Sequence, residues 1–183
     1  SGCQGFTHLP RDAGHLQARE CLTRGLRYWD SNAFLAYFHE EAGRVDSCEA
    51  ILAEAESGKI LIVTCALTLA EVLALRGEPR LPPTTEMKRK VIDFFKNEYV
   101  AVVNVSREVA ELARDLVWDH GVKPKDAVHV ASALVAQAPI FETFDKPLIR
   151  KSKTLGGNPP MVIREPPPSQ APSLPLQGGG KRK

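Results

Sequence analysis

Short apolar runs alternate with helix-like segments through the middle of the chain, and this alternation restricts the fold more than any other feature. The clearest runs are residues 59–64 (KILIVT) and 100–105 (VAVVNV). Unbroken β-branched runs are typical of strands that are buried on both faces of a parallel sheet. Shorter runs occupy residues 26–29 and 140–144. Such strands, separated by helices of about 10–15 residues, predict an α/β fold with a parallel sheet.

The segments between these runs carry helix signals. The expected helices cover residues 31–39, 45–57, 68–76, 84–97, 107–118 and a segment that starts at Pro124. Ser106 is a favoured N-cap for the fifth of them. Pro124 suits the first turn of the last, because its missing N–H is not needed there. A short edge strand is expected at residues 161–163.

The two ends of the chain differ in composition from its middle. Residues 1–26 show no clear apolar period and contain several glycines, so we expect a poorly ordered N-terminal extension. Residues 27–165 hold the alternating pattern and form the predicted domain. Residues 166–183 are rich in Pro and Gly, which predicts a disordered tail.

Neither a membrane span nor a secretory signal is expected. No run reaches the roughly 18 apolar residues that a span needs. The first 20 residues lack a basic start followed by an apolar block. The four cysteines are widely spaced, with no Cys-x-x-Cys pair, which argues against a zinc site or a disulfide framework. We therefore expect a cytoplasmic protein without a membrane partner.

The net charge of +2 does not indicate a basic nucleic-acid-binding domain. Residues 27–165 contain 18 Lys and Arg against 20 Asp and Glu, and the positive surplus lies in the two ends. A nucleotide-binding P-loop is also excluded at Gly58-Lys59, because Ala53 and Ile60 occupy positions that require Gly and Ser or Thr.

Four acids are candidates for a shared site, although each also has a structural interpretation. Asp30 and Asp145 follow strands and could cap a helix or a turn. Asp126 lies in the first turn of its helix, where an acid complements the helix dipole. Glu71 lies on the apolar stripe of its helix, where it needs a cation or hydrogen bonds unless it reaches water.

Taken together, the four acids point to one edge of the sheet. In open parallel sheets, ligands bind outside the carboxyl ends of the strands. Four carboxylates that converge there would repel one another unless they surrounded a divalent cation. Oxygen-only ligands suit Mg²⁺ or Mn²⁺ better than Zn²⁺. A common task of such a centre is the hydrolysis of a phosphodiester.

The motifs around these acids resemble those of PIN-domain nucleases, most closely the VapC-type toxins of toxin–antitoxin pairs. The matching segments are Asp30-Ser31-Asn32, residues 69–72 (LAEV), residues 125–133 (KDAVHVASA) and residues 143–145 (TFD). The segment around Asp126 is the most specific. The resemblance covers about residues 27–165.

The resemblance implies a three-layer α/β/α fold with a parallel sheet of about four to five strands. It also implies an endoribonuclease toxin, dependent on Mg²⁺ or Mn²⁺, that hydrolyses RNA phosphodiesters with metal-activated water. Asp30, Glu71, Asp126 and Asp145 would hold the metal and act in catalysis. Two supporting polar residues, Asn32 and Thr143, would orient carboxylates or water. A cognate antitoxin and a homodimer are the implied protein partners.

Basic residues directly after Asp145 are candidates for contacts with RNA phosphates. They are Lys146, Arg150 and Lys151, for which a solvated helix face is the alternative. His129 is interpreted as structural. Two other functions stay open: a housekeeping PIN-domain nuclease for RNA processing, and a PIN-fold module that binds RNA or protein without cutting. A small antitoxin reading frame directly upstream would favour the toxin.

Overall fold

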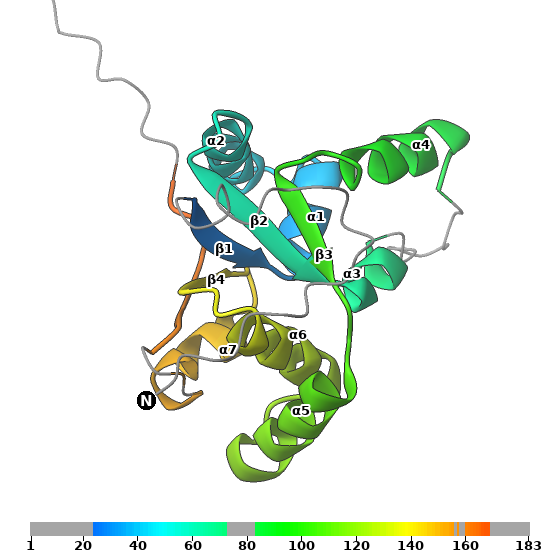
Figure 1. Cartoon of the computed structure of the whole chain (residues 1–183). Coiled ribbons are helices and arrows are strands. Elements are labelled where there is room, and N and C mark those ends of the chain that lie inside the picture. The colour runs from blue at the N-terminus through cyan, green and yellow to red at the C-terminus, as the bar shows by residue number, and fades with distance from the viewer. Residues whose placement is uncertain (1–23, 73–82, 156, 158–159, 169–183) are drawn as a thin grey trace, which may run out of the picture.

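A computed structural model describes residues 24–72, 83–155, 157 and 160–168 of the chain. Within these residues, five parallel strands form one sheet in the order β3-β2-β1-β4-β5 (Figure 1). The strands are β1 Gly25–Trp29, β2 Ile60–Cys65, β3 Val100–Val103, β4 Ile140–Glu142 and β5 Val162–Arg164. The predicted parallel α/β sheet is therefore confirmed. The predicted N-terminal extension lies outside the described residues apart from its last three positions, and so does the tail after residue 168.

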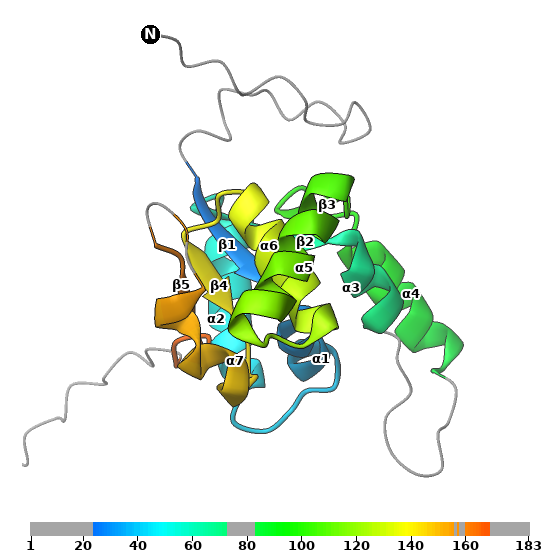
Figure 2. The ribbon, with the colours of Figure 1, turned by 90° about the horizontal axis from the view of Figure 1, so that it is seen from below.

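Helices cover both faces of the sheet. The helices are α1 Ser31–Phe38, α2 Val45–Glu56, α3 Ala66–Glu71, α4 Thr85–Phe94, α5 Arg107–His120, α6 Pro124–Val135 and α7 Lys146–Arg150. A 3₁₀ turn at Ser152–Thr154 precedes β5. One face packs against α1, α2 and α4, and the other against α5, α6 and α7 (Figure 2). This arrangement confirms the three-layer α/β/α fold.

Consecutive side chains of the central strands enter opposite cores. Tyr28 packs with α5 and α6, whereas its neighbour Trp29 packs with α1 and α2. Val63 and Ile62 of β2 divide between the two cores in the same way. Side chains alternate between the faces of a strand, so a strand covered on both faces needs apolar residues at every position. This requirement explains the unbroken apolar runs in the sequence.

Helix boundaries follow the predicted capping residues closely. The Ser106 hydroxyl accepts from the Val109 amide at 3.2 Å, and Pro124 occupies the first turn of α6. The edge strand expected near residue 162 is β5. α3 begins at Ala66, two residues before the expected start, and residues 73–76 of that predicted helix lie outside the described residues.

The end of β4 differs from the prediction. The strand stops at Glu142 instead of continuing to Phe144, directly before Asp145. The Asp145 carboxylate accepts from the Leu148 amide at 2.8 Å and so caps α7. α7 therefore begins at Lys146, after a connection of three residues from the end of the strand.

Glu142 is a fully buried acid that joins three strands. It accepts from Trp29 Nε1 at 2.9 Å and from Arg164 Nη2 at 3.2 Å, and Arg27 Nη1 lies 3.6 Å away. Burial raises the pKa of Glu142, and the Trp29 and arginine contacts oppose that effect. Arg27 also pairs with Glu54 of α2 at 2.7 Å. The network therefore holds β1, β4, β5 and α2 together.

The strand order changes direction at β1. β2 and β3 follow on one side of β1, and β4 and β5 lie on its other side. A ligand crevice forms at the carboxyl ends of the strands at such a reversal. Because α6 leads back to the start of β4, its first turn lies at this same edge. In the part of the chain that the structure describes, no helix combines the length and apolar character needed to cross a bilayer.

A candidate acidic site at the carboxyl edge of the sheet

A pocket of about 240 Å³ lies at the carboxyl end of β1, the strand at which the strand order changes direction. Its wall is formed by α1, α3, α6 and the residue between β1 and α1. The lining residues are Asp30, Ser31, Asn32, Leu35, Ala70, Glu71, Lys125, Asp126 and His129. Three of the four predicted acids therefore share one pocket. Asp145 is not among the lining residues.

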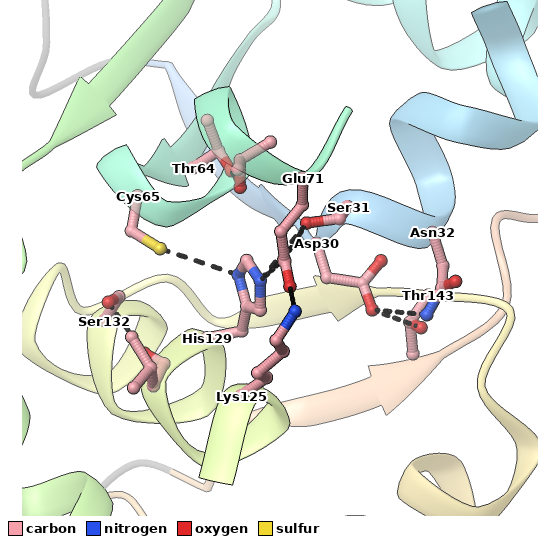
Figure 3. A network of polar contacts seen from close by, with 12 residues as sticks. Asp30, Ser31, Asn32, Thr64, Cys65, Glu71, Lys125, His129, Ser132 and Thr143 are labelled. Atoms are coloured by element: carbon pink, nitrogen blue, oxygen red, sulfur yellow. Dashed lines mark hydrogen bonds and ion pairs between the residues drawn. The ribbon is translucent and has the colours of Figure 1, made fainter. Parts of the chain in front are cut away.

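Asp30 follows β1 directly and is almost completely buried. Its Oδ1 accepts from the Ala33 amide at 3.1 Å and caps α1, as the structural interpretation expected. Its Oδ2 accepts from the Thr143 hydroxyl at 2.6 Å, while Asn32 Nδ2 lies 3.5 Å away (Figure 3). Burial raises the pKa of Asp30 although these hydrogen bonds favour the ionised form. The cap and a place in the pocket coexist, because each uses a different oxygen.

Thr143 connects two of the predicted acids. Its hydroxyl donates to Asp30 and accepts from the Asp145 amide at 2.9 Å. Thr143 is fully buried, so its rotamer is fixed by packing as well as by these bonds. This is the arrangement expected of a supporting residue that orients a carboxylate. Asn32 makes only the long contact with Asp30.

Glu71 is the last residue of α3 and is surrounded by donors. Oε2 lies 2.9 Å from His129 Nε2 and also accepts from the Ser31 hydroxyl. Oε1 pairs with Lys125 Nζ at 3.1 Å (Figure 3). The His129 bond, helped by Ser31 and Lys125 and opposed by burial, lowers the pKa of Glu71 to about 2. The hydrogen bonds and the cation that the sequence demanded for this acid are therefore present.

Interpreted from the sequence as structural, His129 in fact lies in the pocket wall. Its Nδ1 lies 3.0 Å from the Tyr28 hydroxyl and 3.6 Å from Cys65 Sγ, on the side of the ring opposite Glu71. Burial disfavours the charged ring, but the bonds to Cys65 and Glu71 raise the pKa of His129 to about 10. Burial also acts against the Cys65 thiolate, but His129 lowers the pKa of Cys65 to about 7.

Lys125 and His129 are site residues that the sequence analysis missed. Both belong to α6 and are separated by four residues, so they lie on one helix face beside Asp126. The four-residue spacing of Lys125 and His129 could have indicated from the sequence that two potential cations lie beside Asp126. It could not have indicated that both contact Glu71 of α3.

Asp145 acts on Asp126 although it does not line the pocket. Burial raises the pKa of Asp126, and the negative charge of Asp145 raises it further. Asp145 uses Oδ1 to cap α7. The structure thus brings Asp30, Glu71 and Asp126 together in the pocket and leaves Asp145 within electrostatic range of Asp126.

The donor chemistry of the pocket fits a divalent cation. As the side chains lie, no three His, Cys, Asp or Glu of the described residues form a ready metal-binding group. Asp30, Glu71 and Asp126 nevertheless present carboxylate oxygens, which Mg²⁺ and Mn²⁺ prefer. Burial is the main cause of the raised pKa values of Asp30 and Asp126, because it disfavours their ionised forms. A cation in the pocket would stabilise both carboxylates.

The three basic candidates after Asp145 occupy different environments. Lys146 and Arg150 of α7 are exposed. Lys151 Nζ donates to the carbonyl oxygens of His120 and Gly121, at 2.5 and 2.9 Å, and so stabilises the end of α5. None of the three lines the pocket.

Comparison with known proteins identifies the family. A family model described as PIN domain matches residues 27–153. No curated protein matches the sequence significantly. A chain of VapBC2 from Rickettsia felis, crystallised with a DNA fragment from its promoter, superposes with a TM-score of 0.54. It shares 14% identity, over 76% of this chain and 98% of that chain, so the likeness concerns the fold.

Two further solved structures match at similar coverage. A toxin–antitoxin complex from Klebsiella pneumoniae gives a TM-score of 0.47 and 19% identity, over 78% of this chain and 99% of that one. The structure of FitAB bound to an IR36 DNA fragment gives a TM-score of 0.49 and 16% identity, over 76% of this chain and 94% of that chain. The PIN match spans more than half of the 183 residues and contains all four candidate acids. The chain belongs to the PIN-domain family.

Proposed function

We propose that this chain is an Mg²⁺- or Mn²⁺-dependent endoribonuclease and the toxin component of a toxin–antitoxin pair. The observation that carries the proposal is the meeting of Asp30, Glu71 and Asp126 in one pocket at the carboxyl edge of a PIN-domain sheet. Glu71 pairs with Lys125 and His129, whereas no ion pair among the described residues balances Asp30 or Asp126, and carboxylates of this kind attract a divalent cation. They also repel an RNA phosphate unless such a cation is present.

The side chains have separate tasks in this proposal. Asp30 and Asp126 hold the metal, with Asp145 and Glu71 as further acidic groups. Thr143 fixes the direction of the Asp30 carboxylate, since it donates to Oδ2 at 2.6 Å. When bound, the metal would polarise the scissile phosphate and activate water for attack on phosphorus. Lys146 and Arg150 are exposed and free of a structural contact such as that of Lys151, so they remain the better candidates for RNA phosphates.

The toxin assignment rests on the resemblance of four motifs to those of VapC-type toxins. It is supported by the match to the PIN domain over residues 27–153. A cognate antitoxin and a homodimer belong to this part of the proposal. A small reading frame directly upstream, whose product copurifies with the chain and inhibits it, would support the toxin over a housekeeping RNA-processing nuclease.

The test is cleavage of RNA by the purified full chain. Total RNA and matched single-stranded DNA would be incubated with Mn²⁺, with Mg²⁺ and with chelator. We expect RNA cleavage that needs the metal, stops with chelator and returns when metal is added back. The products should carry 5′-phosphate and 3′-hydroxyl ends. If folded, antitoxin-free protein leaves several classes of RNA intact, the chain is instead a module that binds without cutting.

Replacement of Thr143 by Val should reduce cleavage by about 10- to 100-fold, because Asp30 loses the donor that orients it. Stability should fall by about 1–3 kcal/mol, the range for leaving a buried polar group unsatisfied. Initial cleavage rates and urea unfolding measure the two effects. Thr64→Val is the matched control, because the Thr64 hydroxyl is equally buried but donates to the Trp29 carbonyl. Equal losses of cleavage in both variants would contradict a specific role for Thr143.

A further inference from the structure

We propose that His129 is a positioning residue that holds Glu71 through Nε2 while the core holds His129 through Nδ1. The inference rests on the proposed function for its catalytic meaning, although the anchoring itself is testable without cleavage. It assigns a role to a histidine that is not itself a proposed metal ligand and that acts through Glu71. The role depends on which of the two ring nitrogens donates to which neighbour.

The core side of the ring is fixed by Tyr28. The hydroxyl of Tyr28 lies 3.0 Å from Nδ1, and its ring meets that of His129 edge-on, with centroids 6.1 Å apart. Tyr28 is fully buried in β1 and stacks on Phe141 of β4, with centroids 5.0 Å apart. Cys65 at the end of β2 also contacts Nδ1, at 3.6 Å. The three central strands of the sheet therefore determine where the imidazole lies.

The pocket side of the ring is turned to Glu71. Nε2 lies 2.9 Å from Oε2, and the Ser31 hydroxyl lies 3.3 Å from the same nitrogen (Figure 3). His129 is 3% exposed, so this hydrogen bond is protected from competing water. Lys125, another partner of Glu71, has a side chain that is 74% exposed. An exposed ion pair of that kind is weak and screened by salt.

The backbone of Glu71 provides little anchoring of its own. Glu71 ends α3, a helix of six residues in which Thr68 alone is buried. Packing of such a short helix does not fix the direction of a carboxylate at its last residue. The hydrogen bonds to the side chain must do so: the buried Ser31 at the start of α1 supplies one, and His129, which the central strands hold from its other side, supplies another. A carboxylate near a metal generally depends on such a partner, whose loss costs about 10- to 100-fold in metal affinity or activity.

Two amide variants separate the ring nitrogens. In His129→Gln the amide nitrogen falls near the position of Nε2, so it can still donate to Glu71. In His129→Asn the amide falls near Nδ1 and the donor to Glu71 is lost. Tyr28→Phe removes the core partner without changing the ring. Ser132→Ala is the control on the same helix: the buried Ser132 hydroxyl donates to the Val128 carbonyl and lies beside Tyr28 and Cys65, but it contacts no carboxylate, so the variant keeps the donor to Glu71.

The first readout is Mn²⁺ affinity, measured by isothermal titration calorimetry without RNA. We expect His129→Asn to weaken Mn²⁺ binding by about 10- to 100-fold. The Mn²⁺ affinity of His129→Gln should stay within a few-fold of that of wild type, and the affinity of Ser132→Ala should equal that of wild type. Cleavage should follow the same order, with the loss in His129→Asn recovered in part at high Mn²⁺. Equal affinities in the Asn and Gln variants would overturn the assignment of Nε2.

The second readout needs neither metal nor cleavage. Urea unfolding of His129→Asn, Glu71→Gln and the double variant forms a double-mutant cycle in metal-free protein. Anchoring predicts that the double variant is less destabilised than the sum of the single variants. Additive losses would overturn the proposal even if the protein cuts RNA. If His129→Asn does not fold, the same cycle is measured with Tyr28→Phe and Glu71→Gln. Additive losses in that cycle would overturn the claim that the core holds Glu71 through Tyr28 and His129. Coupling without cleavage would leave His129 as the anchor and reject only the nuclease.

Discussion

Asp126→Asn is expected to abolish metal-dependent cleavage while leaving the protein folded. Asn has nearly the shape of Asp but lacks the negative charge that would hold a cation in the pocket. We expect the rate to fall by about 100-fold or more, which corresponds to ~2.7 kcal/mol of transition-state stabilisation. The measurement is the initial cleavage rate of one defined RNA at saturating Mn²⁺, for wild type and variant purified in parallel.

Stability should move in the opposite direction to activity in this variant. Burial and Asp145 raise the pKa of Asp126, so the ionised carboxylate is less favourable in the folded protein than in the unfolded chain. A neutral side chain removes this penalty at pH 7, and the unfolding midpoint should stay equal or rise. Asp119→Asn, at an exposed position of α5, is the control and should leave cleavage unchanged. Equal cutting by Asp126→Asn and wild type would indicate a contaminating nuclease and reject the site.

Glu142→Ala is expected to cause the largest loss of stability, about 3–5 kcal/mol. The substitution leaves Arg27 and Arg164 facing each other without their shared carboxylate, and removes the acceptor of Trp29 Nε1. The cost comes mainly from Arg27, whose side chain is 15% exposed, because a buried charge that loses its partner is destabilising, whereas Arg164 is 39% exposed. Urea unfolding followed by circular dichroism would measure the change, with the denaturant slope compared to confirm a two-state transition.

The control for Glu142 is another acid of the same network. Glu54 pairs with Arg27 at 2.7 Å, but its side chain is 43% exposed. Exposed pairs contribute about 1 kcal/mol or less, so Glu54→Ala should have a small effect. If Glu54→Ala and Glu142→Ala destabilise the protein equally, burial does not govern the network as we infer.

Much of the fold could be predicted because a strand that is buried on both faces has an unbroken run of apolar residues in the sequence. β2 and β3 are apolar at nearly every position and were located within a few residues. β4 was harder, because it has three residues and one of them is the buried Glu142. The arginines that stabilise Glu142 lie on strands β1 and β5, so no local pattern indicates that this acid is buried. The predicted end of β4 was wrong, and the Glu142 network was not predicted, because the partners of Glu142 lie on other strands.

The position of the candidate acids could be predicted because sequence order defines the carboxyl edge of a parallel sheet. Asp30, Glu71 and Asp126 line the pocket at that edge, and their role there stays a prediction. The environment of each acid could not be predicted. The bond from His129 to Glu71 joins α6 to α3, and the long side chain of Lys125 reaches the same acid from the next turn. Contacts between helices depend on side-chain direction, which residue spacing alone does not give.

The pairing of β1 with β4 has a consequence for when the acidic pocket can form during synthesis. β1 leaves the ribosome first, but Asp30 and its hydroxyl partner Thr143 are 113 residues apart in the chain. A nascent chain that has not yet reached β4 lacks Thr143 and Asp145, and its first strand has an open edge. Contacts of such long sequence separation form late and slowly. Each ribosome therefore completes nearly the whole domain before the acidic pocket can assemble, and an interrupted translation product would lack the Asp30–Thr143 contact.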